Sequence, residues 1–115
     1  MPDRVHLTAF TRHIKEATIV KALLCMQLEY ESNFNGIHSS ACWTMLGQLA
    51  KRAWPERRWV QTNAEAVEQL IQHTVCAARS AKIGARELAN VGYGAARSGR
   101  GKLLGVLFAA LAWAA

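Results

Sequence analysis

Proline and cysteine are both scarce in this chain of 115 residues, which contains two prolines and three cysteines. A low proline content together with 51% hydrophobic residues argues against a disordered chain and favours a helical globular one. The cysteines, Cys25, Cys42 and Cys76, are odd in number, lie far apart and follow no signal-peptide pattern. We therefore expect free thiols in a reducing compartment and no disulfide framework.

The motifs of common catalytic and metal sites are also missing. No G-x-S-x-G, H-E-x-x-H or paired-carboxylate pattern occurs in the sequence. His38 and Cys42 lie one helical turn apart, as do His73 and Cys76, but neither pair is accompanied by the second pair that a structural zinc site needs. We therefore predict no enzyme activity, no catalytic residues, no cofactor and no metal.

In the second half of the chain, acidic residues are few relative to basic ones. Residues 1–50 contain four basic and four acidic side chains, whereas the chain from Lys51 onward contains ten basic and four acidic ones. The second half therefore accounts for the whole net charge of +6. This asymmetry indicates a polyanionic partner, with nucleic acid ahead of a membrane surface. The alternative is that the basic side chains only keep a helical protein soluble.

Apolar residues recur with a helical period along the chain, and no segment has the alternation of a convincing strand. We predict about six helices, which span approximately 7–15, 18–31, 37–53, a segment opening at Thr62, 86–98 and 102–115. The fourth of these should bury one stripe of side chains: Val67, Leu70, Ile71, Thr74, Val75 and Ala78.

Local signals set the expected helix ends. Asn35 is a plausible cap for the third helix, whose predicted buried stripe begins at Ile37. Thr62 and Glu65 have the spacing of a capping box for the fourth helix. Between these helices, residues 54–59 contain a proline and are predicted to form a connection, because proline ends a preceding helix.

Two stretches of the sequence, 35–49 and 84–98, align with each other at an offset of 49 positions. In both, a polar residue precedes small residues, a larger residue follows one turn later, and a small residue comes before Gln48 or Arg97. Any two alanine-rich amphipathic helices align in a similar way, so repetition is a hypothesis. A repeat array buries its apolar faces between copies and binds partners along a surface.

The residues of these stretches resemble a known family. Asn35–Ala41 with Leu46–Lys51 is similar to the repeat helix of octotricopeptide and heptatricopeptide proteins, which are allied to FAST-kinase-like and RAP-domain proteins. Arg86–Asn90 with Ala95–Arg97 resembles the same helix, and Leu103–Ala112 resembles its partner helix. The resemblance implies an alpha-solenoid that binds RNA in mitochondria or chloroplasts.

The predicted fold is therefore all-α, a short alpha-solenoid of stacked helical hairpins. It forms a single helical-repeat domain over residues 1–115, with repeat-like units near 18–53 and 62–115. A compact helical bundle has the same periodicities and is the alternative. Residues 103–115 carry no charge and no cap, so we expect other protein subunits or further repeats to cover this last helix.

The predicted function is RNA binding in organellar RNA metabolism, covering stability, processing, translation or ribosome assembly. The location implied by the resemblance is a mitochondrion or chloroplast, and otherwise the cytoplasm. One alternative is a structural subunit of a mitochondrial ribosome or another ribonucleoprotein. A membrane-tethered interaction module is less favoured, because a helix over 103–115 extends about 20 Å against roughly 30 Å of hydrocarbon.

Basic side chains in the second half of the chain are the candidates for holding RNA phosphates. They are Lys51, Arg52, Arg57, Arg58, Arg79, Lys82, Arg86, Arg97, Arg100 and Lys102. The alternative for these residues is a solvated basic face. Trp54 and Trp59 offer indole faces for base stacking, unless they pack on the core. The candidates for contacting base edges are polar side chains at aligned positions: Asn35, His38, Thr44, Glu87 and Asn90.

Overall fold

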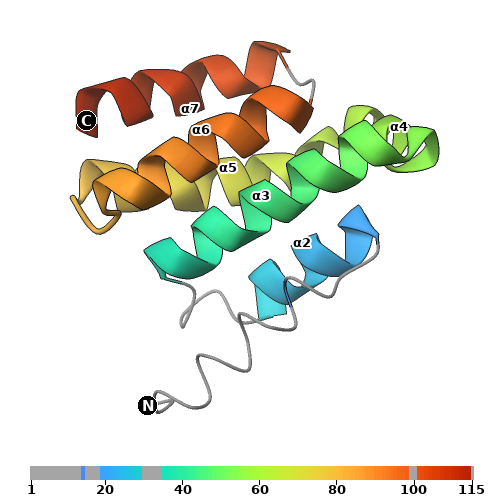
Figure 1. Ribbon diagram of the computed structural model, residues 1–115, viewed down its shortest axis with the longest axis horizontal. Helices are drawn as coiled ribbons and strands as arrows, with labels where there is room; N and C mark the ends of the chain where they lie inside the picture. Colours follow the sequence, from blue (N-terminus) through green and yellow to red (C-terminus); the bar gives the residue numbers. More distant parts are fainter. Residues whose placement is uncertain (1–13, 15–18, 30–34, 99–100, 115) are drawn as a thin grey trace.

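The computed structural model describes residues 14, 19–29, 35–98 and 101–114 of the chain. Within these ranges the protein is all-α, with six helices and no strand, which confirms the predicted fold class (Figure 1). The helices are α2 (Val20–Glu29), α3 (Gly36–Arg52), α4 (Trp54–Thr62), α5 (Ala64–Arg79), α6 (Ala85–Ser98) and α7 (Gly101–Ala114).

The helices from α3 onward form two hairpins that lie side by side (Figure 1). The first pairs α3 with α5 through the short α4, and the second pairs α6 with α7. Helix α3 packs on α6, and α5 packs on α7. The two helices of each of these pairs run in the same direction (Figure 1). Helix α2 lies on the side of α3 that faces away from α6. With extents of 36 × 31 × 21 Å, the arrangement is consistent with both a short solenoid and a compact bundle.

The two stretches that align in the sequence form α3 and α6, and this pair has the most extensive helix contact in the described part of the chain. A Cβ atom on Gly47 would lie 2.6 Å from the carbonyl oxygen of Gly94, and a Cβ on Gly94 would overlap the carbonyl of Trp43. The two backbones approach this closely because glycine has no side chain. Each interior glycine costs about 1 kcal/mol of helix propensity relative to alanine, and this contact offsets that cost at Gly47 and Gly94.

A buried indole joins the two layers of the fold. Trp43 is fully buried, and its Nε1–H donates to Oγ1 of Thr74 on α5 at 2.9 Å. The Thr74 hydroxyl in turn donates to the carbonyl oxygen of Leu70 at 2.8 Å. The predicted stripe of the fourth helix is confirmed as core, since its members are all buried: Val67, Leu70, Ile71, Thr74, Val75 and Ala78.

The predicted cap of α3 is confirmed. The Oδ1 atom of Asn35 accepts from the His38 N–H at 2.9 Å, and Nδ1 of His38 accepts from the Asn35 N–H at 3.2 Å. The predicted stripe is partly wrong, because Ile37 is 56% exposed. The buried residues of α3 include Cys42, Trp43 and their neighbours, since this helix packs against other helices on several sides. On α2, Leu28 is likewise 46% exposed.

The connection predicted over 54–59 is wrong, because these residues begin helix α4. Pro55 lies in the first turn, where the missing N–H would have no intrahelical partner in any case. Since α4 continues to Thr62, the Thr62 hydroxyl donates to the carbonyl of Arg58 at 3.0 Å and does not cap α5. The predicted capping box of Thr62 and Glu65 is therefore also wrong.

The predicted helix over 7–15 lies outside the described residues except for Ile14, which is buried. Six helices are therefore found as predicted, but α4 takes the place of that helix in the described part. Helix α4 also contacts the N-terminus of α2, where Oε1 of Glu56 accepts a hydrogen bond from the Val20 N–H at 2.7 Å. A carboxylate at this helix N-terminus satisfies one of the unpaired amides and complements the helix dipole.

The turn between α5 and α6 has the hydrogen bonds of a Schellman motif. The Lys82 N–H donates to the Ala77 carbonyl at 2.9 Å, and the Ala81 N–H donates to the Ala78 carbonyl at 3.1 Å. Ala81 has a φ of 56°, a left-handed conformation in which glycine is usual. The turn is therefore built at some cost in backbone energy.

Candidate nucleic-acid interface

A groove of about 580 Å³ lies along the exposed side of α3 and is bordered by the first half of α6. Among the described residues, its walls are formed by Ile37, Ser40, Ala41, Thr44, Met45 and Gln48 of α3 and by Arg86, Glu87 and Asn90 of α6. This volume is within the range of about 300–1,000 Å³ that is typical of small-ligand sites. The groove is therefore large enough for a nucleobase.

Several polar groups of the groove are available to a ligand. The Thr44 hydroxyl donates to the Ser40 carbonyl at 2.9 Å, and its oxygen keeps lone pairs that can accept. The side chains of Gln48, Glu87 and Asn90 form no hydrogen bond or ion pair with the other residues that the structure describes. The structure thus brings together three of the predicted base-edge residues, Thr44, Glu87 and Asn90.

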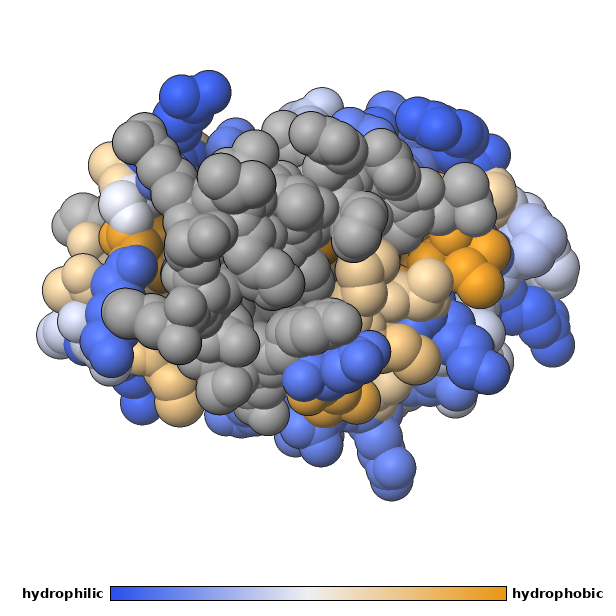
Figure 2. All heavy atoms as spheres, turned by 90° about the horizontal axis from the view of Figure 1, so that it is seen from below, coloured by the Kyte–Doolittle hydropathy of each residue, from blue (hydrophilic) through white to orange (hydrophobic). Residues whose placement is uncertain are grey.

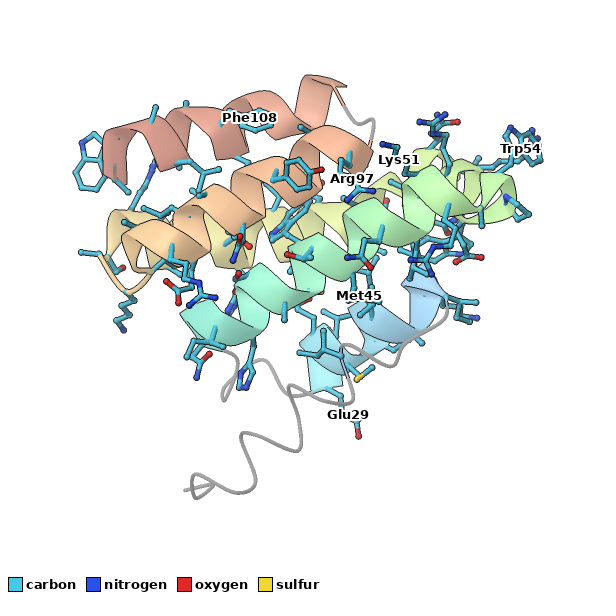
Figure 3. The ribbon with its side chains drawn as sticks, in the orientation of Figure 1. Glu29, Met45, Lys51, Trp54, Arg97 and Phe108 are labelled. Atoms are coloured by element: carbon cyan, nitrogen blue, oxygen red, sulfur yellow. The ribbon has the colours of Figure 1, made fainter. Side chains whose placement is uncertain are left out.

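Basic side chains lie at both ends of this surface. Arg86 borders the groove, and the exposed Lys82 lies in the turn that packs against Gly36 at the start of α3. At the other end, Arg97 of α6 packs beside Gly47 of α3, and Lys51 lies one turn further along α3 (Figure 3). The two ends of α6 are about 20 Å apart, given its length of 14 residues. These four predicted cations therefore form two groups, with the groove beside the first.

Arg97 belongs to an aromatic contact that the sequence analysis missed. Its guanidinium carbon lies 5.2 Å from the centroid of the Tyr93 ring, and this ring is 63% exposed. The Arg97 Nε atom is buried and has no hydrogen-bond partner. A signal for Tyr93 was present in the sequence, because the offset of 49 aligns it with Thr44.

The two predicted stacking residues of α4 have different environments. Trp54 is 66% exposed at the end of the molecule, and the Arg58 guanidinium lies 5.4 Å from its ring centroid (Figure 3). Trp59 is partly buried and packs against the hydrophobic core, as the alternative interpretation held. Arg52 and Arg57 are exposed nearby. Trp54 is therefore the indole of this pair that offers a face to a base.

His38 is buried in the first turn of α3. It is 1% exposed and its Nδ1 atom is engaged by the cap of α3, because the helix turns this residue toward the interior. Asn35 is exposed, but its side chain is likewise used in the cap. The burial of His38 therefore argues against its predicted role at a base edge.

Three further predicted cations lie away from the groove or outside the described structure. Arg79 is exposed at the end of α5, in the other helix layer. Arg100 lies outside the described residues. Lys102 belongs to α7, and its side chain is not among those described.

The described residues contain no group of three or more histidine, cysteine or acidic side chains that could hold a metal ion. Burial raises the pKa of Cys42 from an ordinary value of 9.0 to about 12, so the thiol stays protonated at neutral pH. Cys25 and Cys76 are exposed.

Apolar side chains are exposed on the outermost helices. Ile19 lies immediately before α2 and Leu28 lies on it. Hydrophobic patches beside hydrophilic side chains are visible from this side of the molecule (Figure 2). Val106, Phe108 and Trp113 lie on α7 and are 50%, 40% and 70% exposed. None of the helices in the described ranges has the length and apolar content that a bilayer crossing requires.

No family model matches this chain, and no curated protein or solved structure matches it.

Proposed function

We propose that this chain binds single-stranded RNA along the exposed side of α3 and α6. The observation that supports this most strongly is the groove, whose available polar groups on Thr44, Gln48 and Asn90 lie on the same two helices as the cations Lys51 and Arg97. Single-stranded RNA needs both kinds of group, because its bases are read by hydrogen bonds and its phosphates are held by positive charge.

The positions of these groups suit an extended strand. Lys51 is two helical turns beyond Thr44, at a distance of about 10 Å along the helix axis. A strand with one base in the groove would run along α3 and α6 toward Lys51 and Arg97, which would hold phosphates further along it. The exposed Tyr93 ring and the Trp54 indole extend this surface with faces on which further bases can stack.

We place this activity in organellar RNA metabolism, as the family resemblance implies. A structural subunit of a ribonucleoprotein is the second candidate. The exposed apolar side chains of α7 favour it, because Val106, Phe108 and Trp113 would be covered by a protein neighbour in such an assembly.

The proposal is tested by fluorescence anisotropy with a labelled uridine oligonucleotide at increasing salt. We expect affinity to fall steeply between about 50 and 200 mM salt, because binding releases counterions. The double variant Lys51→Gln/Arg97→Gln should bind more weakly and reduce the salt slope by about 2.

The matched control is Lys21→Gln/Arg79→Gln, which removes two exposed positive charges from α2 and α5. This variant should retain most of the affinity and the slope. Affinity that does not change with salt would contradict the proposal, and so would equal losses in the two double variants.

A further inference from the structure

We propose that the groove between α3 and α6 takes an unpaired guanine base and distinguishes it from the other three bases. This inference rests on the proposed RNA binding, for which it specifies the substrate. The observation that carries it is that the consecutive residues Arg86 and Glu87 bring a guanidinium and a carboxylate to the same wall of the groove.

The two charged groups offer different hydrogen-bonding edges. Glu87 is half-buried and, in the described part of the chain, has no cation as an ion-pair partner. Its carboxylate can only accept hydrogen bonds, and it has two oxygens side by side. The exposed Arg86 can only donate, through the planar fork of its guanidinium. A ligand that uses both must present adjacent donors next to adjacent acceptors.

Guanine is the base that has this arrangement. Its N1–H and N2–H₂ groups are neighbouring donors, and its O6 and N7 atoms are neighbouring acceptors that match arginine. Adenine places an acceptor, N1, beside a single amino group, and uracil places its one N–H between two carbonyl oxygens. Cytosine has one amino donor beside an acceptor. A carboxylate therefore meets two donors on guanine and at most one on each other base.

The remaining walls suit the rest of a nucleoside. Met45, with Ile37 and Ala41, supplies apolar surface for the face of the base, and a thioether makes favourable contacts with aromatic rings. Thr44 and Asn90 offer a hydroxyl and an amide for the ribose 2′-hydroxyl, which both donates and accepts.

The test compares short uridine oligonucleotides that carry one central guanine, adenine, cytosine or uracil. With the whole chain, we expect the guanine oligonucleotide to bind about tenfold more tightly than the other three. Glu87→Gln should reduce this preference to about twofold or less while leaving the affinity for all-uridine RNA at least as high, because a negative charge is lost.

Glu68→Gln is the matched control, because it removes the same charge from an exposed position on α5. It should keep the tenfold preference. Arg86→Lys retains the charge and loses the fork, so it should lower the affinity for the guanine oligonucleotide more than the affinity for all-uridine RNA. Circular dichroism and thermal unfolding show whether each variant is folded as the parent is.

Equal binding of the four oligonucleotides with a steep salt dependence would overturn the guanine assignment and leave the proposed RNA binding intact. A preference for guanine that survives Glu87→Gln would also overturn the assignment. If none of the four oligonucleotides binds, the proposed function fails and the assignment fails with it.

Discussion

The two pairs of parallel neighbouring helices, α3 with α6 and α5 with α7, are packed by different means. In the first pair the backbones meet at Gly47 and Gly94. In the second pair the core positions hold mostly aliphatic side chains such as Leu70 and Leu107, and α5 contains no glycine. The exposed sides differ as well, because α3 and α6 border a groove lined by both polar and apolar side chains, whereas α7 exposes Phe108 and other apolar side chains.

The difference in packing explains why the candidate interface lies on α3 and α6. A backbone contact without intervening side chains leaves little freedom in the spacing of two helices, so the groove walls on α3 and α6 are held at a fixed separation. Side chains in the α5–α7 pair can repack more easily when one of them changes. The rigid pair therefore carries the groups that would have to be positioned for recognition.

The largest effect should come from breaking the glycine contact. Gly94→Ala places a methyl group against the Trp43 carbonyl, and we expect the free energy of unfolding in urea to fall by about 3 kcal/mol. The control on the same helix is Gly92→Ala, whose new methyl group would have Leu111 Cδ1 as its nearest neighbour at 3.8 Å. This variant should be unchanged or about 1 kcal/mol more stable. Similar results for both variants would contradict the described packing.

A smaller loss is expected from the hydrogen bond that joins the two layers. Thr74→Val removes the acceptor of the buried Trp43 Nε1–H, and an unsatisfied buried donor costs about 2 kcal/mol. Thr62→Val, at an exposed position of α4, should change the free energy of unfolding by less than about 0.5 kcal/mol. A Thr74→Val protein as stable as the parent would show that the indole has another acceptor.

A gain of stability is expected in the turn that connects the two hairpins. Ala81→Gly relieves a left-handed alanine, and thermal unfolding should show a stabilisation of about 1 kcal/mol. The same replacement at Ala89, an exposed position inside α6, should destabilise by about 1 kcal/mol. Destabilisation by both substitutions would contradict the Schellman geometry.

The smallest effect at neutral pH concerns the thiols. Cys25 and Cys76 should react with a disulfide reagent in the native protein, and Cys42 should react after unfolding, because it is buried and protonated. The pKa of Cys42 rises from 9.0 to about 12 on folding, so its contribution to stability is complete below pH 9 and is lost as the pH rises toward 12. A native protein with three equally reactive thiols would contradict the buried position of Cys42.

The helical periodicity predicted α3, α5, α6 and α7 and the buried stripe of α5, because one apolar face determines a helix and its orientation when a single side is buried. The periodicity wrongly predicted that Ile37 is buried, since α3 is surrounded by other helices and several of its sides are buried. Pro55 was misread because proline at the first turn of a helix and proline after a helix give the same local pattern.

The candidate site was predicted in part. Aligning the two stretches selected Thr44, Glu87 and Asn90, which the fold brings to one groove because the aligned helices are neighbours. The same alignment selected His38, which is buried, since a shared pattern does not show how a helix is turned. Gln48 and Tyr93 were not selected, because an alignment does not show which side chains the packed helices leave accessible.

The most direct test of RNA binding at α3 and α6 is amide chemical-shift mapping by nuclear magnetic resonance during titration with a uridine oligonucleotide that contains one guanine. We expect the largest shifts at Thr44, Gln48, Asn90 and Arg97, with little change over 106–113 on α7. Shifts confined to α7, or no shifts at saturating RNA, would contradict RNA binding at α3 and α6.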